Sequence, residues 1–174
     1  MKKIAYGLIA ALVLGCTPAV NGQNHATAIK VQAMDMATAF MKNDFTAFSR
    51  FMHPNIVAFA GGPEQMKIKM DSAYNAMKRF NVTFKRYWIG NPGKIINHKD
   101  QLQAALPVNI TMKTPLGDVI TETTMVVISN DKGRNWWFID TNVYKAEKLK
   151  DILPEISSEL LIPPAKKPRL MPSR

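Results

Sequence analysis

The feature that most constrains the fold is a run of alternating apolar and polar residues near the middle of the chain. Because neighbouring side chains of a β-strand point to opposite faces, this pattern predicts a strand with one buried face. A charge at Leu106 is therefore expected to destabilise the fold, while a charge at Gln103 is expected to cost little. Pro107 predicts a bulge or an edge position. The alternating apolar residues are Leu102, Ala104, Leu106, Val108, Ile110 and Met112.

Other segments of the chain also have the composition of strands. They are rich in β-branched and aromatic residues, and Pro, Gly, Asn or Asp cluster in the turns between them. Since the turns that join the long strands are short, they predict antiparallel pairing. Besides the central strand, we expect strands over residues 56–60, 82–89, 94–97, 119–129 and 135–141.

Helical spacing of apolar residues dominates the region before the long strands. Residues 26–42 repeat apolar side chains three or four positions apart, which predicts an amphipathic helix. Asp44 is placed to cap a second, short helix, and Pro63 suits the first turn of a third. After the last strand, residues 143–162 predict an added C-terminal helix. Residues 163–174 contain four Pro and four basic residues, which predicts disorder.

This order of elements is an α+β layout. Residues 42–45, 51–57 and 136–140 resemble the nuclear transport factor two-like superfamily, also called SnoaL-like or ketosteroid-isomerase-like. The resemblance covers residues 26–142. It implies a cone-shaped, strongly curved antiparallel sheet packed on N-terminal helices, with a pocket inside. The superfamily holds isomerases, dehydratases and binding modules, so this fold does not fix a function.

For the isomerase members, the resemblance implies an aspartate base on the strand after the second helix. The strand expected here, residues 56–60, has no acid or base, which argues against that chemistry. His53 and Asp140 form an alternative catalytic pair. The competing interpretations are a turn role for His53 and a structural hydrogen bond for Asp140. The candidate pocket residues are Tyr74, Tyr87, Trp88, Trp136 and Asp140.

The composition excludes several classes of site. Cys16 is the only cysteine and the three His are scattered, so no disulfide framework or multi-cysteine metal site is expected. The chain has eleven Met, and those in the expected helices, such as Met36, Met66 and Met70, follow the apolar stripes, which favours packing or an apolar pocket over a copper(I) site. No phosphate-binding glycine loop is present. We expect neither a metal nor a cofactor.

The N-terminus resembles a bacterial lipoprotein signal. Two lysines precede the apolar residues 4–14, a run that is too short to span a membrane, and the run ends in Leu14, Gly15 and Cys16. The resemblance implies that residues 1–15 are removed and that Cys16 is lipidated by diacylglyceryl transfer and N-acylation. An ordinary secretory peptide with a chance cysteine is the alternative.

The residues after Cys16 suggest where the protein goes. Thr17 rather than Asp follows the cysteine, which by the same resemblance favours the outer membrane, on its periplasmic face. Residues 16–25 are expected to form a flexible lipidated tether. The formal charge is +10, yet an envelope location removes nucleic acid as a natural partner.

These features lead to two functional hypotheses. The first is a membrane-anchored lipoprotein whose non-catalytic pocket domain binds a small apolar ligand or an envelope protein. The alternative is a lyase or isomerase of unknown substrate that uses His53 and Asp140. The sequence leaves a homodimer open.

Overall fold

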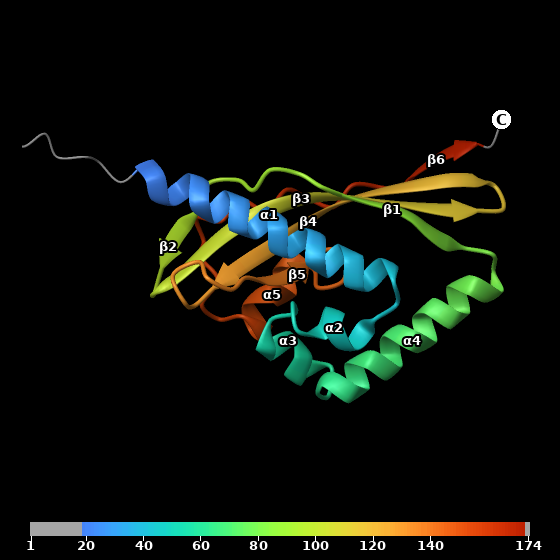
Figure 1. Ribbon diagram of the computed structural model, residues 1–174, viewed down its shortest axis with the longest axis horizontal. Helices are drawn as coiled ribbons and strands as arrows, with labels where there is room; N and C mark the ends of the chain where they lie inside the picture. Colours follow the sequence, from blue (N-terminus) through green and yellow to red (C-terminus); the bar gives the residue numbers. More distant parts are fainter. Residues whose placement is uncertain (1–18, 173–174) are drawn as a thin grey trace, which may run out of the picture.

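The computed structural model describes residues 19–172 and has an α+β architecture, with four helices preceding an antiparallel sheet (Figure 1). The helices are α1 (Ala19–Met41), α2 (Phe45–Ser49), α3 (Pro54–Phe59), α4 (Pro63–Arg79) and α5 (Ala146–Ile152). The strands are β1 (Thr83–Ile89), β2 (Ile96–His98), β3 (Gln101–Thr114), β4 (Gly117–Ser129), β5 (Trp137–Asp140) and β6 (Arg169–Pro172).

Strands β3 and β4 form the centre of the sheet, whose main order is β1-β3-β4-β5. Strand β2 pairs with the start of β3, and β6 pairs with the start of β4. Strand β1 pairs with the part of β3 after Pro107, and β2 pairs with the part before it. Pro107 itself pairs with neither strand, so the predicted edge position is present there. The sheet is twisted but not strongly curled, so the predicted cone is not confirmed (Figure 1).

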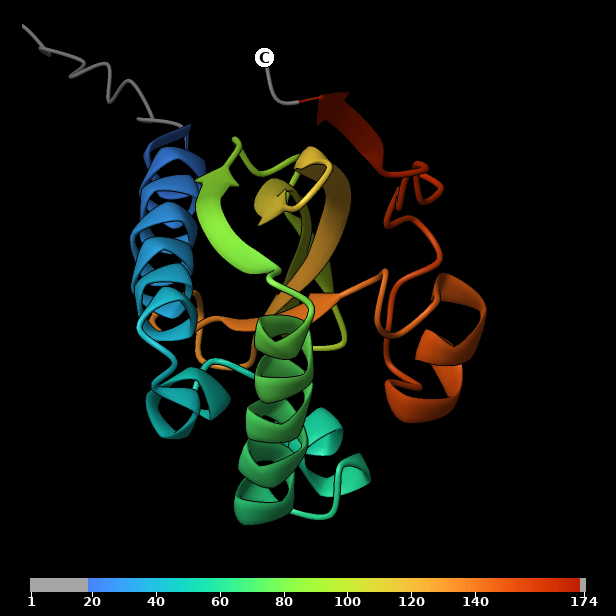
Figure 2. The same ribbon diagram turned by 90° about the vertical axis from the view of Figure 1, so that its right-hand side faces the viewer.

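The alternating pattern of the central strand is confirmed for Ala104, Leu106 and Val108, whereas Leu102, Ile110 and Met112 are only half-buried. Ala104, Leu106 and Val108 have no exposed surface and face α1, whose own buried residues include Ile29 and Met36. Figure 2 shows α1 and α4 on one side of the sheet and the chain after β5 on the other. We call these two sides the helix face and the C-terminal face.

The expected strand over residues 56–60 is wrong, because this segment belongs to helix α3. Pro54 occupies the first turn, and the Asn55 amide donates to Nδ1 of His53, 3.2 Å away, which caps the helix. A short apolar run fits a buried strand and a buried helix equally well, so spacing did not separate them. The argument against isomerase chemistry drawn from this strand therefore no longer applies.

Helix α1 begins at Ala19, inside the segment predicted to be a flexible tether. The ring of His25 packs edge-on against Trp136, with 6.2 Å between ring centroids, and lies directly against Gly133. A side chain at position 133 would clash with this ring, so the glycine permits the close approach. This packing stabilises the first part of the helix. The predicted signal peptide and Cys16 lie outside the described residues.

The C-terminal region also differs from the prediction. Helix α5 ends at Ile152 instead of continuing to residue 162, because Pro154 disfavours a helical conformation in the residue before it. Residues 169–172, predicted to be disordered, form β6 on the part of β4 that β5 leaves uncovered. Both Lys166 Nζ and Arg169 Nη2 contact the Glu122 carboxylate at 2.6 Å, which holds the segment in place.

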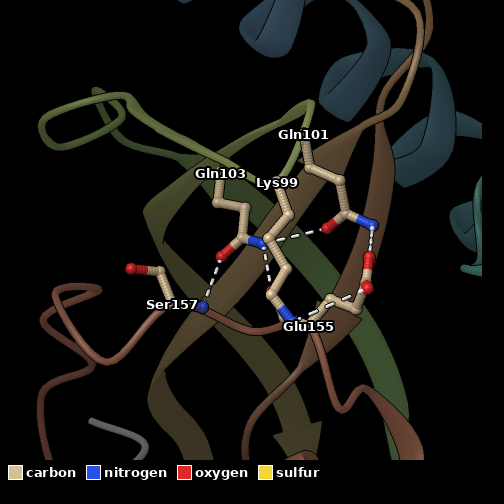
Figure 3. A network of polar contacts seen from close by, with 5 residues as sticks. All are labelled: Lys99, Gln101, Gln103, Glu155 and Ser157. Carbon is tan, nitrogen blue, oxygen red and sulfur yellow. Dashed lines mark hydrogen bonds and ion pairs between the residues drawn. The ribbon is translucent and has the colours of Figure 1, made fainter.

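The C-terminal face is closed by polar contacts to Gln103, which the sequence pattern placed in solvent (Figure 3). Gln103 is fully buried, and its Nε2 donates to the Glu155 carbonyl at 2.8 Å and to Gln101 Oε1 at 2.9 Å. Its Oε1 accepts from the Ser157 amide at 2.8 Å. The chain after α5 therefore covers this face through hydrogen bonds, with Leu153 and Leu160 buried beside them.

Candidate functional site

A cavity of about 450 Å³ lies between helix α4 and the helix face of the sheet. Its volume is within the range of small-molecule sites. Most of its wall is apolar, since α4 and the adjoining helices supply methionine and phenylalanine side chains at helical spacing. The apolar wall includes Phe40, Phe48, Met52, Met66, Met70 and Met125.

Asp140 is the acidic residue of this cavity and ends strand β5. Its Oδ1 accepts from Thr123 Oγ1 at 2.6 Å and from the Asn142 amide at 2.8 Å. No hydrogen bond of its other oxygen, Oδ2, is found among residues 19–172, and Asp140 is half-buried, so this oxygen is accessible from the cavity. Burial raises the pKa of Asp140, although the two hydrogen bonds act in the opposite direction.

Tyr87, on β1, brings a hydroxyl group to the same cavity. This hydroxyl donates to the sulfur of Met125 at 3.9 Å, which is a weak interaction. Burial, followed by the negative charge of Asp140, raises the pKa of Tyr87. The phenol therefore keeps its proton at neutral pH and remains a hydrogen-bond donor.

Lys69, on α4, is the cation that lines the cavity. Its ammonium group donates to the Ala60 carbonyl at the end of α3, 2.8 Å away. In the described part of the chain, Asp140 makes no ion pair with this or any other basic side chain. The cavity thus combines an apolar wall with a carboxylate that has no positive partner.

The remaining candidate pocket residues lie elsewhere. Tyr74 packs edge-on against Phe45, with ring centroids 6.2 Å apart. Trp88 is half exposed on the opposite side of β1 from Tyr87. Trp136 is buried near the start of β5, where its Nε1 donates to the Gly133 carbonyl at 3.1 Å. Of the predicted set, the structure brings Tyr87 and Asp140 together.

His53 and Asp140 lie on opposite faces of the sheet. The His53 ring packs against Trp137, with centroids 5.3 Å apart, and it lines a smaller pocket of about 230 Å³ beside Glu155. Since Trp137 and Asp140 are three residues apart on one strand, their side chains point to opposite faces. Burial lowers the pKa of His53, whose Nδ1 is occupied by the α3 cap. The geometry therefore separates the alternative catalytic pair.

Sequence reasoning missed several residues of the cavity. Lys69 and Tyr144 were not singled out, and Thr123, which holds Asp140, was treated as part of an ordinary β-branched strand. Two signals were present. Met66 and Met70 are spaced for one helix face, and Thr123 and Thr124 directly precede the apolar run at the end of β4.

Two further site classes can be checked in the described residues. No group of three or more His, Cys, Asp or Glu side chains within residues 19–172 is placed to hold a metal ion. In the same part of the chain, no helix combines the length and the apolar character needed to cross a bilayer.

Comparison of the chain with protein families, curated proteins and solved structures finds no significant match.

Proposed function

We propose that this protein is a membrane-anchored envelope lipoprotein whose folded domain binds a small apolar ligand. The observation that carries the proposal is the cavity of about 450 Å³ beneath α4, with its wall of Phe and Met side chains. Burial of about 200 Å² of ligand surface at about 25 cal/mol per Å² contributes about 5 kcal/mol. Methionine side chains adapt to different shapes, which suits such a wall.

The polar groups of the cavity orient the ligand. Asp140 Oδ2 and the Tyr87 hydroxyl are available to hydrogen-bond a polar group, while the rest of the ligand contacts apolar side chains. His53 faces the other side of the sheet, so the cavity lacks the base of the proposed pair. Ligand binding without chemistry is therefore the function that this arrangement supports best.

The domain is further proposed to be a divergent member of the nuclear transport factor two-like superfamily. Support comes from the element order, in which N-terminal helices precede a long antiparallel sheet. The position of the cavity between those helices and the sheet agrees with the same proposal.

Binding to the cavity is tested with N-phenyl-1-naphthylamine, a neutral probe whose fluorescence rises when it leaves water. Ala73 lines the cavity from an exposed position, so Ala73→Phe places a large ring at the cavity wall and should weaken probe binding by tenfold or more. Ser72, the neighbouring residue on α4, is also exposed but does not line the cavity, so Ser72→Phe is the matched control. Equal binding by both variants would place the probe outside this cavity.

The anchor is tested separately by replacing the lipidated residue. Cys16→Ala removes the acceptor sulfur, and two or three acyl chains contribute about 0.8 kcal/mol per buried CH₂, so the variant should leave the membrane fraction. Thr17→Ala keeps the sulfur and should stay anchored. Retention of Cys16→Ala in the membrane fraction would show that the cysteine is not the anchor.

A further inference from the structure

The cavity contains a carboxylate, that of Asp140, in which only one of the two oxygens accepts hydrogen bonds from the described residues. Two donors hold Asp140 Oδ1 at 2.6 and 2.8 Å, while Oδ2 has no partner within the described residues. Asp140 is half-buried, and a carboxylate that is partly removed from water gains from a positive partner. Oδ2 is therefore the position in the cavity where a bound cation would be favoured.

The surroundings of Asp140 suit a cation with an apolar body. Phe40 packs against Phe84 and Tyr87, with ring centroids 4.6 and 5.9 Å apart, and all three rings line the cavity. Aromatic faces attract ammonium groups through the negative charge of the ring face. An ammonium group at Asp140 would therefore meet both a carboxylate and aromatic rings.

Other groups on the cavity wall do not supply this charge. The Lys69 ammonium is directed to the carbonyl of Ala60, which also lines the cavity. The remaining titratable groups that face Asp140 are the phenols of Tyr87 and Tyr144, and burial raises the pKa of each. Both phenols are neutral at physiological pH, so they do not balance the charge of Asp140.

We infer that the ligand of this cavity is a small lipophilic amine. Its ammonium group pairs with Asp140 Oδ2, and its hydrocarbon body lies against the rings and methionines of the wall. The inference rests on the proposed binding function of the cavity and names the chemical class of ligand. It distinguishes this class from neutral apolar molecules of the same size.

The pairing makes amine binding depend on pH. Asp140 must lose its proton to form the ion pair, whereas an alkylammonium keeps its proton up to a pH of about 10. Amine affinity should therefore rise as the pH rises from 4 to 8. The affinity of a neutral alcohol should not rise over this range, because it gains no ion pair.

The experiment compares 4-phenylbutylamine with 4-phenylbutan-1-ol, which share one hydrocarbon body. Each is titrated calorimetrically into the full chain and is tested for displacement of the naphthylamine probe. At pH 8 the amine should bind at least tenfold more tightly than the alcohol. In Asp140→Asn, which is similar in size and keeps an oxygen acceptor, the amine should lose its advantage, so that the two compounds bind with similar affinity.

The outcomes separate this inference from the function on which it rests. Alcohol binding without an amine preference in the unaltered protein would overturn the amine assignment and leave the binding function standing. An amine preference that persists in Asp140→Asn would also overturn it, as would amine affinity that falls with rising pH. If neither compound displaces the probe, the binding function itself fails. The comparisons on the unaltered protein do not depend on the folding of any variant.

Discussion

The two faces of the sheet are closed in different ways. On the helix face, long helices pack apolar side chains against β3 and β4, yet they leave a cavity beside Asp140. On the C-terminal face, a chain that is mostly without helix or strand lies against the sheet, held by hydrogen bonds to Gln103 (Figures 2 and 3). Both faces keep open space: the helix face holds the apolar cavity of about 450 Å³, and the C-terminal face holds smaller pockets of about 230 and 200 Å³.

This difference has a physical cause. A straight helix does not follow the curvature of a twisted sheet, and here the space between α4 and the sheet is left partly unfilled. An irregular segment follows the surface residue by residue, but its backbone needs hydrogen-bond partners, which Gln103 provides. The helix face is consequently suited to ligand binding and the C-terminal face to structural closure.

The largest effect is expected on the helix face. Leu106→Asp places a charge at a fully buried position without a partner and should destabilise the protein by about 3–5 kcal/mol. Leu106→Met keeps the site apolar and should cost less than about 1.5 kcal/mol. Urea denaturation of both variants measures the difference, and equal midpoints would contradict the burial of this face.

A smaller effect is expected on the C-terminal face, where the sequence pattern predicted almost none. Gln103→Ala removes three hydrogen bonds and leaves the buried Ser157 amide without its acceptor, which should cost about 2 kcal/mol. Asn109→Ala, at a half-buried position on the same face of β3 and outside this network, is the control and should cost less. Comparable unfolding midpoints for the two variants would mean that the C-terminal chain does not depend on Gln103.

Asp140, on the helix face, should lower the stability of the folded protein as the pH rises. Its pKa is raised by burial, so the folded protein holds this proton more tightly than the unfolded chain does. Stability is therefore lost as the pH rises from the ordinary aspartate pKa through the raised one. Asp140→Asn removes this loss, and its thermal midpoint relative to the unaltered protein should increase between pH 4 and pH 8. Each unit of pKa difference corresponds to about 1.4 kcal/mol. A constant difference between the two midpoints across this pH range would exclude a raised pKa.

The smallest effect is expected at β6. The Lys166 ion pair and hydrogen bond lower the pKa of Glu122, with a further contribution from Arg169, so the contacts persist until the pH falls through that lowered value. Glu122→Gln should speed amide hydrogen exchange in β6 without changing global unfolding. Lys67, which pairs with Asp71 on α4, offers the control Lys67→Gln, which should leave exchange in β6 unaltered. Exchange in β6 that is equally slow in both variants would show that strand pairing alone holds the segment.

Local sequence signals were sufficient to predict those helices and strands whose formation depends on residues close together in the sequence. The alternation of residues 102–112 predicted β3 with its buried side, Asp44 predicted the cap of α2, and Pro63 predicted the start of α4. Each depends on neighbouring residues, through the two-residue period of a strand or a cap a few positions away. The prediction of a strand over residues 56–60 was wrong because a run of five apolar residues has no period that separates helix from strand.

The sequence by itself determined the α+β class, the order of most elements and the helix face of the central strand, because these follow from local periodicity and turn chemistry. Tertiary structure alone decided that Gln103 is buried, that residues 169–172 form a strand and that His53 is separated from Asp140 by the sheet. These outcomes depend on which distant segment covers each face and edge. Tertiary structure also placed Tyr87 and Asp140 in one cavity, since they come from strands at opposite ends of the β1-β3-β4-β5 order. Their meeting required the whole sheet to form, and no local pattern specifies it.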